Sequence, residues 1–350
     1  MSMSTNHPLI SIVGPTASGK TKLALNLAKD ILAKGEVAGV DLISADSRQV
    51  YRAFEILSGA DLGDFLDMGL IWEKDPVKLI PNYQPSSEFS PLPTSAQSSS
   101  ASIWTSPQQS PYPFLTTLDH TLTLHGAAII GLKNEWSLGH FYHLASQLIS
   151  TAQKLNRQVI IVGGTMLYHD KLLADNELIF IPRNEKFRAQ IADWDLAQLQ
   201  AELQKIDPPS WDKLNQSDRH NPHRLTRKLE IAHHQLQLQP QKPQPSPFSQ
   251  TQHRYFIPDF NLAELKEKIT QRVKWRFKAG AVNEVKRALP IIGSNPDTRS
   301  NLSLPIGFNE VEQYLAEKID ELTAIELWSL HEWQYLKRQL TWWRKKDLLS

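Results

Sequence analysis

The sequence predicts an α/β protein in which helices flank a parallel β-sheet. Two observations lead to this fold class. Short runs of apolar and β-branched residues end at glycine or polar residues, and amphipathic helical patterns stand between several of them. Strands that alternate with helices form βαβ units, and the strands of such units run parallel in one sheet. The predicted strands occupy residues 9–13, 40–44, 127–131 and 158–163.

The first helix is expected directly after the first strand. From Lys20 onward, apolar residues recur every fourth position and therefore share one face of a helix. These residues are Leu23, Leu27 and Ile31. Gly35 provides the stop for this helix. Two further helical patterns, at about 139–155 and 165–174, flank the fourth strand.

Two segments interrupt the α/β pattern. Residues 85–113 contain six prolines, ten serines and a single charged residue, so we expect a disordered insertion. Residues 239–250, QPQKPQPSPFSQ, are typical of an extended linker. Between these two segments, residues 184–237 are rich in helical patterns and in charged residues. We therefore expect an α/β core over 1–174, a small helical insertion domain over 175–220, and the rest of the core with a helical C-terminal region over 221–350.

The C-terminal region begins with one more strand. This strand is HRYFIP, residues 253–258, and it follows the linker. Helical patterns then occupy about 261–289, 307–317 and 322–346.

The composition excludes several classes of protein. The chain has no cysteine, which excludes disulfides and cysteine-ligated metal sites and favours a reducing cytoplasm. The net charge of +1 argues against a wholesale polyelectrolyte binder but permits a local basic face. No signal-peptide pattern is present, and no apolar run reaches the roughly 20 residues of a membrane span, so we expect no membrane association.

A phosphate-binding loop lies between the first strand and the first helix. Residues 14–21, GPTASGKT, match the pattern G-x-x-x-x-G-K-[ST] in the strand–loop–helix context that this pattern requires. The backbone amides of such a loop and the start of the helix form an anion site, to which the lysine adds a charge. The residues expected to bind a diphosphate or nucleotide are Gly14, Pro15, Thr16, Ala17, Ser18, Gly19, Lys20 and Thr21. Thr21 can also offer its hydroxyl to Mg²⁺. Because kinases, ATPases and GTPases share this loop, the fold is expected to be P-loop NTPase-like and the reaction stays open.

Two other strand ends should face this loop. Asp46 follows the second strand, and ligands of α/β sheets bind at the carboxyl ends of strands. Asp46 can be a magnesium ligand, a general base, or only a turn or capping residue. Thr165 follows Gly163 and Gly164 after the fourth strand; its hydroxyl can point at a ligand or only cap the next helix.

Five sequence blocks together resemble bacterial tRNA dimethylallyltransferases, which prenylate the adenosine next to the tRNA anticodon. In order, the blocks are GPTASGKT, ISADSRQVY, VGGTMLY, NPHRLTRKLEI and KRQLTWWR. The resemblance covers most of the chain outside roughly 60–120 and 239–250. It implies that the phosphate loop binds the diphosphate of dimethylallyl diphosphate, that Mg²⁺ assists, and that the anticodon stem-loop of tRNA is the partner.

The resemblance also assigns roles to individual residues. It implies Asp46 as the general base, Thr165 as a contact of the prenyl diphosphate, and Arg272 near that diphosphate. The segments implied to touch the tRNA are Asp46, Ser47, Arg48 and Gln49, and His223, Arg224, Leu225, Thr226 and Arg227.

Basic and aromatic residues alternate in two C-terminal segments. Residues 272–278 read RVKWRFK, and residues 331–346 read HEWQYLKRQLTWWRKK. Cationic groups that bind phosphates and aromatic faces that stack on splayed bases are what RNA loops require. We expect Lys337 and Arg338 to contact tRNA; the alternative is that the tryptophans belong to the core and the charges to a solvated face.

The chain departs from the family pattern at three places. After Tyr51 it reads RAFEILSGADLGDF where the family has a segment like GMDIGTAKP, with Ser58 and Gly59 as partial counterparts. A usual histidine pair is reduced to His125, and a usual IGY-type block reads LPIGFNE. These departures leave the expected diphosphate site in place and bear on tRNA recognition.

The sequence therefore favours a monomeric, cytoplasmic prenyltransferase that acts on tRNA. Two alternatives stay open. One is a different P-loop enzyme, either an adenylate prenyltransferase or a small-molecule kinase. The other is a non-catalytic RNA-binding relative.

Overall fold

The chain divides into two compact units. The computed structural model describes residues 7–60, 62–73, 106, 110, 112–173, 181, 183–237, 248, 251–293, 299 and 302–348. The first unit comprises residues 1–90, 102–173 and 248–350, and the second comprises residues 91–101 and 174–247. Most of the predicted insertion at 85–113 and of the predicted linker at 239–250 lies outside the described residues.

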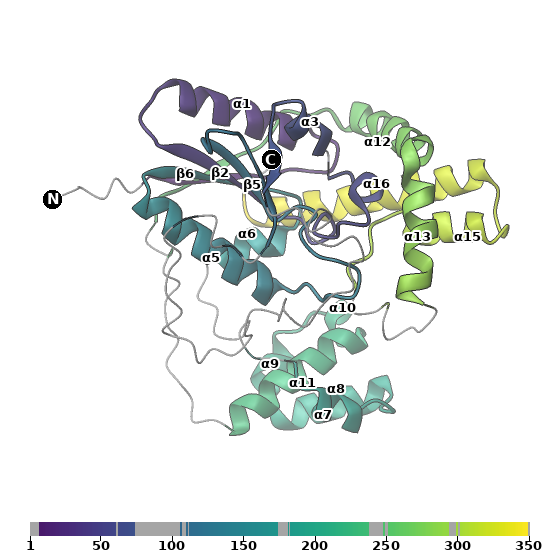
Figure 1. Cartoon of the computed structure of the whole chain (residues 1–350). Helices are drawn as coiled ribbons and strands as arrows, with labels where there is room; N and C mark the ends of the chain where they lie inside the picture. Colours follow the sequence, from purple (N-terminus) through teal and green to yellow (C-terminus); the bar gives the residue numbers. More distant parts are fainter. Residues whose placement is uncertain are drawn as a thin grey trace. The chain divides into compact units, whose positions relative to one another are not determined.

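The first unit is built on a seven-stranded sheet (Figure 1). Its strands are β1 (Leu9–Ile12), β2 (Gly39–Ser44), β3 (Ile71–Glu73), β4 (Phe114–Thr116), β5 (Leu122–His125), β6 (Arg157–Val162) and β7 (His253–Phe256). They lie in the order β3-β4-β5-β2-β6-β1-β7. The five strands from β5 to β7 are parallel, with Ile10 and Leu42 both in register with Ile160. The predicted parallel α/β sheet is thus confirmed for the part of the sheet that carries the phosphate loop.

The sheet departs from the sequence prediction at one edge. β3 and β4 pair antiparallel, and β4 is antiparallel to β5. The predicted strand at 127–131 is wrong: the strand is β5, and it ends before Gly126. Positive φ angles at Gly126 (82°) and Ala128 (51°) turn the chain out of the sheet. The segment then joins the loop after β2 instead, where Ala128 donates to the carbonyl of Gln49 at 2.8 Å.

Helices cover both faces of the sheet. Figure 1 shows α1 (Lys20–Ala33) on one face and α5 (Leu138–Lys154) with α6 (Met166–Leu173) on the other. The apolar stripe predicted for α1 is confirmed, because its residues pack against the buried core of the sheet; they are Leu23, Leu27 and Ile31. Burial of this stripe is what fixes α1, and with it the phosphate loop, on the sheet.

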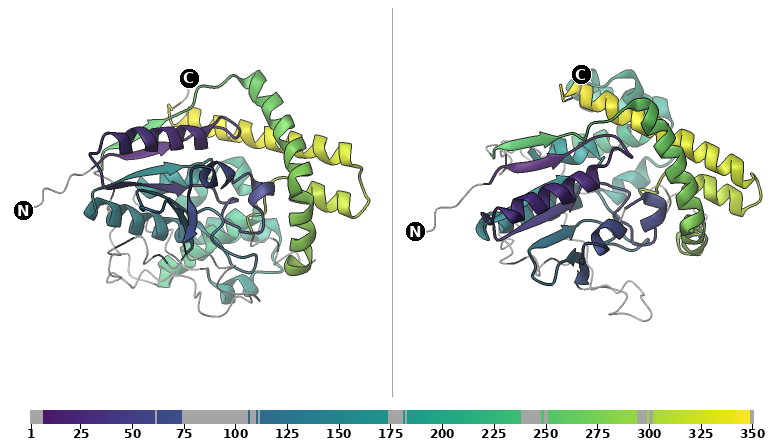
Figure 2. Two further views of the ribbon diagram at one scale, coloured as in Figure 1. Left: turned by 45° about the horizontal axis from the view of Figure 1, so that its top comes forward. Right: turned by 90° about the horizontal axis from the view of Figure 1, so that it is seen from above.

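The C-terminal helices pack beside the sheet in the same unit (Figure 2). They are α12 (Leu262–Arg276), a π-helical turn (Phe277–Ala281), α13 (Val282–Ile292), α15 (Phe308–Leu315) and α16 (Glu321–Lys345). Sequence periodicity predicted one helix over 261–289. The structure breaks it at Gly280, whose φ of 130° is outside the helical region. The long helix α16 packs against both α12 and α15.

The second unit is entirely helical within its described residues. Its helices are α7 (Glu185–Gln190), α8 (Leu196–Ile206), α9 (Pro208–Asp212), α10 (Gln216–Arg219) and α11 (Pro222–Gln237). The sequence placed the end of the helical insertion at residue 220, whereas the compact unit continues through α11. The second unit includes α11 because Leu225 and Leu229 of this helix are fully buried in the core of the unit, against Leu199 and Leu203 of α8.

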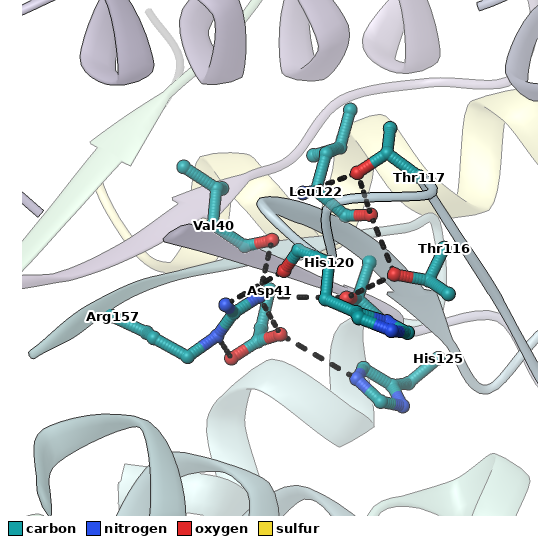
Figure 3. Close-up of polar contacts among 9 residues, drawn as sticks. Val40, Asp41, Thr116, Thr117, His120, Leu122, His125 and Arg157 are labelled. Atoms are coloured by element: carbon teal, nitrogen blue, oxygen red, sulfur yellow. Dashed lines mark hydrogen bonds and ion pairs between the residues drawn. The ribbon is translucent and has the colours of Figure 1, made fainter. Parts of the chain in front are cut away.

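A buried ion pair joins the amino-terminal ends of β2 and β6 (Figure 3). Arg157 donates from Nε and Nη2 to the two carboxylate oxygens of Asp41, both at 2.9 Å. Its Nη1 donates to the carbonyl of His120 at 2.9 Å, and His125 lies 3.6 Å from Asp41. Burial alone would raise the pKa of Asp41, but the nearby His125 and the hydrogen bonds and charge of Arg157 outweigh it and hold that pKa below its usual value.

Replacing Asp41 with alanine should destabilise the fold strongly. The guanidinium of Arg157 would be left buried without its counter-charge, which costs about 3–5 kcal/mol of unfolding free energy. Urea unfolding followed by circular dichroism measures the loss. Asp30→Ala, at an exposed position of α1, is the control and should change stability by less than about 0.5 kcal/mol. A loss of less than about 1 kcal/mol for Asp41→Ala would contradict the role assigned to this pair.

Two histidines share one hydroxyl beneath the phosphate loop. Ser11 Oγ of β1 lies 3.1 Å from Nδ1 of His169 and 2.8 Å from Nε2 of His253. Burial lowers the pKa of His169 to about 3 and that of His253 to about 4, and the proximity of the two rings adds to the shift for His169. Both rings are therefore neutral in the folded protein at neutral pH.

This arrangement predicts a loss of stability in mild acid. Because both folded pKa values lie below the ordinary value of about 6.5, the unfolded chain takes up these protons first. The free energy of unfolding should fall as pH decreases below 6.5 and continue to fall toward pH 4. His253→Gln should make this dependence shallower in urea titrations between pH 7.5 and 5. His120→Asn, in an exposed turn, is the control and should leave the pH dependence unchanged. Equal slopes for the wild type and both variants would show that His253 does not cause this dependence.

Candidate active site

The phosphate loop has the backbone geometry of an anion site. Gly14, Ala17 and Gly19 have φ angles of 147°, 61° and 84°, and α1 begins at the next residue, Lys20. Successive amides therefore turn toward one concavity, and the first turn of α1 contains no acidic residue to compete with an anion. A left-handed φ at Ala17, which is not glycine, indicates strain of the kind kept at binding sites. The hydroxyl of Ser18 is buried and has no partner among the described residues.

Asp46 lines the same cavity as this loop and lies just beyond the carboxyl end of β2. Its Oδ1 accepts a hydrogen bond from the backbone N–H of Arg48 at 3.0 Å. Burial raises the pKa of Asp46, and Glu332 adds to the rise, while Arg48 and Lys20 act against it. A half-buried carboxylate with a raised pKa can accept a proton more readily than an exposed one.

Thr165 fixes the position of the segment that carries Asp46. Its Oγ1 accepts from the backbone N–H of Ser47 at 3.0 Å, and its own N–H donates to the carbonyl of Ala45 at 3.0 Å. A Cβ on Gly163 would lie 2.2 Å from the same carbonyl, so only glycine allows this close approach. The loops after β2 and β6 are therefore joined directly.

Two arginines of α12 complete the cationic side of the cavity. Arg272 donates to the carbonyl of Gly59 at 3.4 Å, and Gln49 donates to the same carbonyl at 2.9 Å. Arg276 is buried and donates to Glu332 of α16 at 3.0 Å. The predicted residue Arg272 is thus joined by Arg276, one helical turn further along α12, which the sequence analysis missed.

A carboxylate holds the short helix that carries Gly59. Glu284 of α13 accepts from the backbone amides of Ile56 and Leu57, at 2.9 and 2.7 Å, in the first turn of α2 (Glu55–Ser58). Burial raises the pKa of Glu284, opposed by these two hydrogen bonds. The segment that departs from the family pattern after Tyr51 therefore forms a defined wall of the site.

One cavity, open to solvent, is lined by the phosphate loop, Asp46 and the arginines of α12. Its polar lining includes Lys20, Asp46, Arg272, Arg276 and Glu332. Its apolar lining comes from Leu57, Phe65, Leu124, Ala127 and Val162. An anion with an apolar tail matches this division, and so does a phosphorylated ligand with a flat apolar base.

The same cavity offers oxygen ligands for a hard cation. The side chains of Thr21, Asp46 and Asp64 line it, and hydroxyl and carboxylate oxygens are what Mg²⁺ prefers. Within the residues that the structure describes, no cluster of three or more acidic or histidine side chains forms a metal site. A magnesium ion here would therefore also need oxygens of a bound phosphate, and Thr21 fits as its protein ligand.

The predicted tRNA contacts of α16 are exposed. Lys337 and Arg338 extend into solvent, and each lies over an aromatic ring of its own helix, at 5.6 Å from Trp333 and Tyr335 respectively. Tyr335 also faces Arg48, whose guanidinium lies 5.0 Å from the ring centre. Several α16 tryptophans are nonetheless core residues, since Trp328 and Trp343 are buried, as the alternative interpretation stated.

The remaining predicted tRNA contacts lie in the helical unit. His223 and Arg224 are exposed on α11, and Arg224 pairs with Asp218. Arg227 donates to Glu230, and Thr226 is half-buried. The side chain of Leu225 is fully buried in the helical core, so the prediction that it contacts tRNA is wrong for its side chain. These five residues belong to the second unit, and none of them lines the cavity.

The sequence analysis missed a residue that links two sides of the site. Gln339 lies in the block KRQLTWWR, of which only the basic residues Lys337 and Arg338 were predicted to be functional. It is buried and contacts both the phosphate loop and the loop after β6. The spacing of Leu336 and Leu340 on the buried face of α16 was the available signal, because Gln339 shares that face.

Fold and site together define a P-loop-like α/β protein with a cavity that basic and acidic side chains line. A model of the IPP transferase family matches residues 119–346. The chain therefore belongs to the IPP transferase family. Among the described residues, no helix is long and apolar enough to cross a membrane.

Named relatives match over nearly the whole chain. The tRNA dimethylallyltransferase of Natranaerobius thermophilus is 27% identical, in a match that covers 97% of this chain and 84% of the relative. The tRNA dimethylallyltransferase 1 of Syntrophus aciditrophicus is 28% identical, covering 97% and 90%.

Two solved structures share the fold. The full-length tRNA isopentenylpyrophosphate transferase of Bacillus halodurans gives a TM-score of 0.53 at 23% identity, covering 98% of this chain and 88% of that one. A eukaryotic dimethylallyltransferase acting on tRNA gives 0.62 at 19% identity, covering 96% and 69%. The predicted fold class is thereby confirmed.

Replacing Gly59 with alanine should disturb the cationic side of the cavity. Gly59 has a φ of 63°, and a Cβ there would lie 2.0 Å from Nη2 of Arg276 and 2.7 Å from Nη2 of Arg272. Displacement of both guanidinium groups should weaken binding of inorganic diphosphate by about tenfold or more, measured by calorimetry. Gly63→Ala is the matched control, because a Cβ at that position would have no neighbouring atom within 4 Å. Equal affinities for the two variants would show that these arginines do not bind the anion.

Proposed function

We propose that this protein transfers the dimethylallyl group of dimethylallyl diphosphate to the exocyclic amine of the adenosine next to a tRNA anticodon, releasing diphosphate. The observation that carries the proposal is that Lys20, Asp46 and Arg272 line one cavity. Thr165 is tied to the same loop as Asp46 by its hydrogen bond from the N–H of Ser47. Membership of the IPP transferase family and relatives named tRNA dimethylallyltransferase support it.

The cationic side of the cavity suits a diphosphate leaving group. In the reaction the adenine nitrogen forms a bond to the terminal allylic carbon, and the bond from that carbon to the diphosphate oxygen breaks. The electron pair of that bond goes to the diphosphate. Lys20, the loop amides and the arginines of α12 stabilise the negative charge that develops on the diphosphate.

Asp46 is the group best placed to accept the proton. An exocyclic amine becomes strongly acidic as it is alkylated, so a carboxylate within hydrogen-bond reach suffices as general base. The raised pKa of Asp46 favours this step, and Thr165 fixes the segment that carries it through the amide of Ser47. Thr165 is also proposed to contact the prenyl diphosphate.

Magnesium is the proposed cofactor. Thr21 would hold it together with oxygens of the diphosphate, and the bound ion would neutralise part of the negative charge of the leaving group.

The proposed RNA partner is the anticodon stem-loop of tRNA. Ser47, Arg48 and Gln49 lie beside Asp46, where the target base must enter after leaving its stack. Lys337 and Arg338 on α16, and Arg224 and Arg227 on α11, offer cationic groups for its phosphates, and His223 on α11 offers a further polar side chain. We further propose that the protein works as a monomer in the cytoplasm.

A transfer experiment tests the proposal against its alternatives. The protein is incubated with labelled dimethylallyl diphosphate and tRNA whose anticodon-adjacent adenosine is unmodified, and the digested tRNA is searched for prenylated adenosine. Label on free AMP alone would instead support an adenylate prenyltransferase. Consumption of ATP with phosphoryl transfer would support a kinase, and tRNA binding without transfer would support a non-catalytic relative.

Asp46→Asn should remove catalysis and keep diphosphate binding. Loss of the general base should lower kcat by about 10²–10⁴-fold in single-turnover transfer assays. The Kd of inorganic diphosphate should change by less than about threefold, since the side chain keeps its size and loses a negative charge. Asp67→Asn, at an exposed turn, serves as the control. A normal transfer rate for Asp46→Asn would exclude Asp46 as the base.

A further inference from the structure

One buried amide side chain bridges two loops of the site. Gln339 Oε1 accepts a hydrogen bond from the backbone N–H of Thr16 in the phosphate loop at 2.9 Å. Its Nε2 donates to the carbonyl of Gly164, in the loop after β6, at 3.0 Å. The side chain is 3% exposed, so neither contact is shared with bulk water.

The fit around this amide is close on both sides. A Cβ on Gly164 would lie 2.3 Å from Nε2 of Gln339, so the glycine allows the contact. The hydroxyl of Tyr335, one turn earlier on α16, donates to the same Gly164 carbonyl at 3.4 Å. Gln339 therefore occupies a site in which both the donor and the acceptor of the amide are used.

An apolar contact one turn further along α16 reinforces the bridge. Trp343 packs in a cluster with Val13 and Met166. Val13 directly precedes Gly14 of the phosphate loop, and Met166 directly follows Thr165. Helix α16 thus contacts both loops twice. Trp343 packs against residues next to the two loops, and Gln339 bonds to the backbone within them.

The chemistry of the side chain matters as much as its position. A neutral amide can donate and accept at once, which no aliphatic or charged side chain of this size does. A carboxylate here would accept from Thr16 but would face the Gly164 carbonyl with no proton, and it would place a negative charge beside a bound diphosphate. Glutamine bridges the loops without opposing the anion.

We infer that Gln339 is a positioning residue that holds the phosphate loop and the Gly164–Thr165 loop at the separation needed for diphosphate binding. It acts on the anion through the backbone of the phosphate loop, and on Asp46 through Thr165 and Ser47. The inference rests on the proposed function for the identity of the anion, dimethylallyl diphosphate. The bridge itself requires only that the cavity binds a diphosphate.

Two variants and one control test the inference. Gln339→Leu removes both hydrogen bonds, and Gln339→Glu keeps the acceptor and, when ionised, removes the donor. Gln334→Leu is the control, because Gln334 is exposed on the same helix. Calorimetry with inorganic diphosphate, without tRNA, gives the Kd, and circular dichroism gives Tm. Gln339→Leu should raise the Kd by about tenfold or more, the size expected for losing one or two buried hydrogen bonds, and Gln334→Leu should not.

The pH profile separates positioning from mere packing. When protonated, the carboxyl group in Gln339→Glu can donate to Gly164 while its carbonyl oxygen accepts from Thr16, as the amide does. Burial beside a carbonyl and an anion should raise the pKa of that carboxyl group. The Kd of Gln339→Glu, divided by that of the wild type at the same pH, should therefore fall from pH 8 to pH 6. The same ratio for Gln339→Leu should stay flat.

The outcomes decide the inference separately from the proposed function. The positioning role would be overturned if both Gln339 variants bound diphosphate with the Kd of the wild type. It would also be overturned if the Kd of Gln339→Glu, relative to that of the wild type, did not depend on pH. If Gln339→Leu does not fold, the pH dependence of Gln339→Glu decides alone. Absence of prenyl transfer by a wild type that binds inorganic diphosphate would refute the proposed function and leave the bridge to be judged by the two Kd ratios.

Discussion

The close approach of three loops at the carboxyl edge of the sheet is the constraint on which the site depends. The loops after β1, β2 and β6 meet there because their strands are neighbours in the order β2-β6-β1. Gly163 lets the backbone reach Ala45, and Thr165 then binds the amide of Ser47. Anion-binding amides and a proton-accepting carboxylate are thereby fixed by backbone contacts, so little rearrangement is needed when a substrate binds.

Charge within the site is balanced by position. Lys20, the arginines of α12 and the carboxylate of Asp46 all line the one cavity. Glu332 would oppose an anion on its own, but Arg276 pairs with it, so its charge is compensated. That pairing also ties α12 to α16, which connects the cationic wall to the helix that carries Gln339.

The two ends of the strands serve different purposes. Near the amino ends, Asp41 and Arg157 form a fully paired, buried network, whose satisfied hydrogen bonds favour a single rigid arrangement. At the carboxyl ends the polar groups are less satisfied: Ser18 Oγ is buried without a partner among the described residues, and Ala17 has a strained backbone. Stability is thus concentrated away from the loops that must accommodate ligands.

Features that depend on short-range order could be predicted from the amino-acid sequence. Strand, phosphate loop and helix are consecutive from residue 9 to 33, so apolar periodicity and two glycines sufficed to predict them. The antiparallel edge of the sheet, the place of α11 and the roles of Arg276 and Gln339 became apparent only in the folded chain. Gln339 and Thr16 are 323 positions apart, and a buried amide on a helix has no local signal that names its partner. Long-range packing brings such groups together, and periodicity records only that a residue is buried, not what it meets.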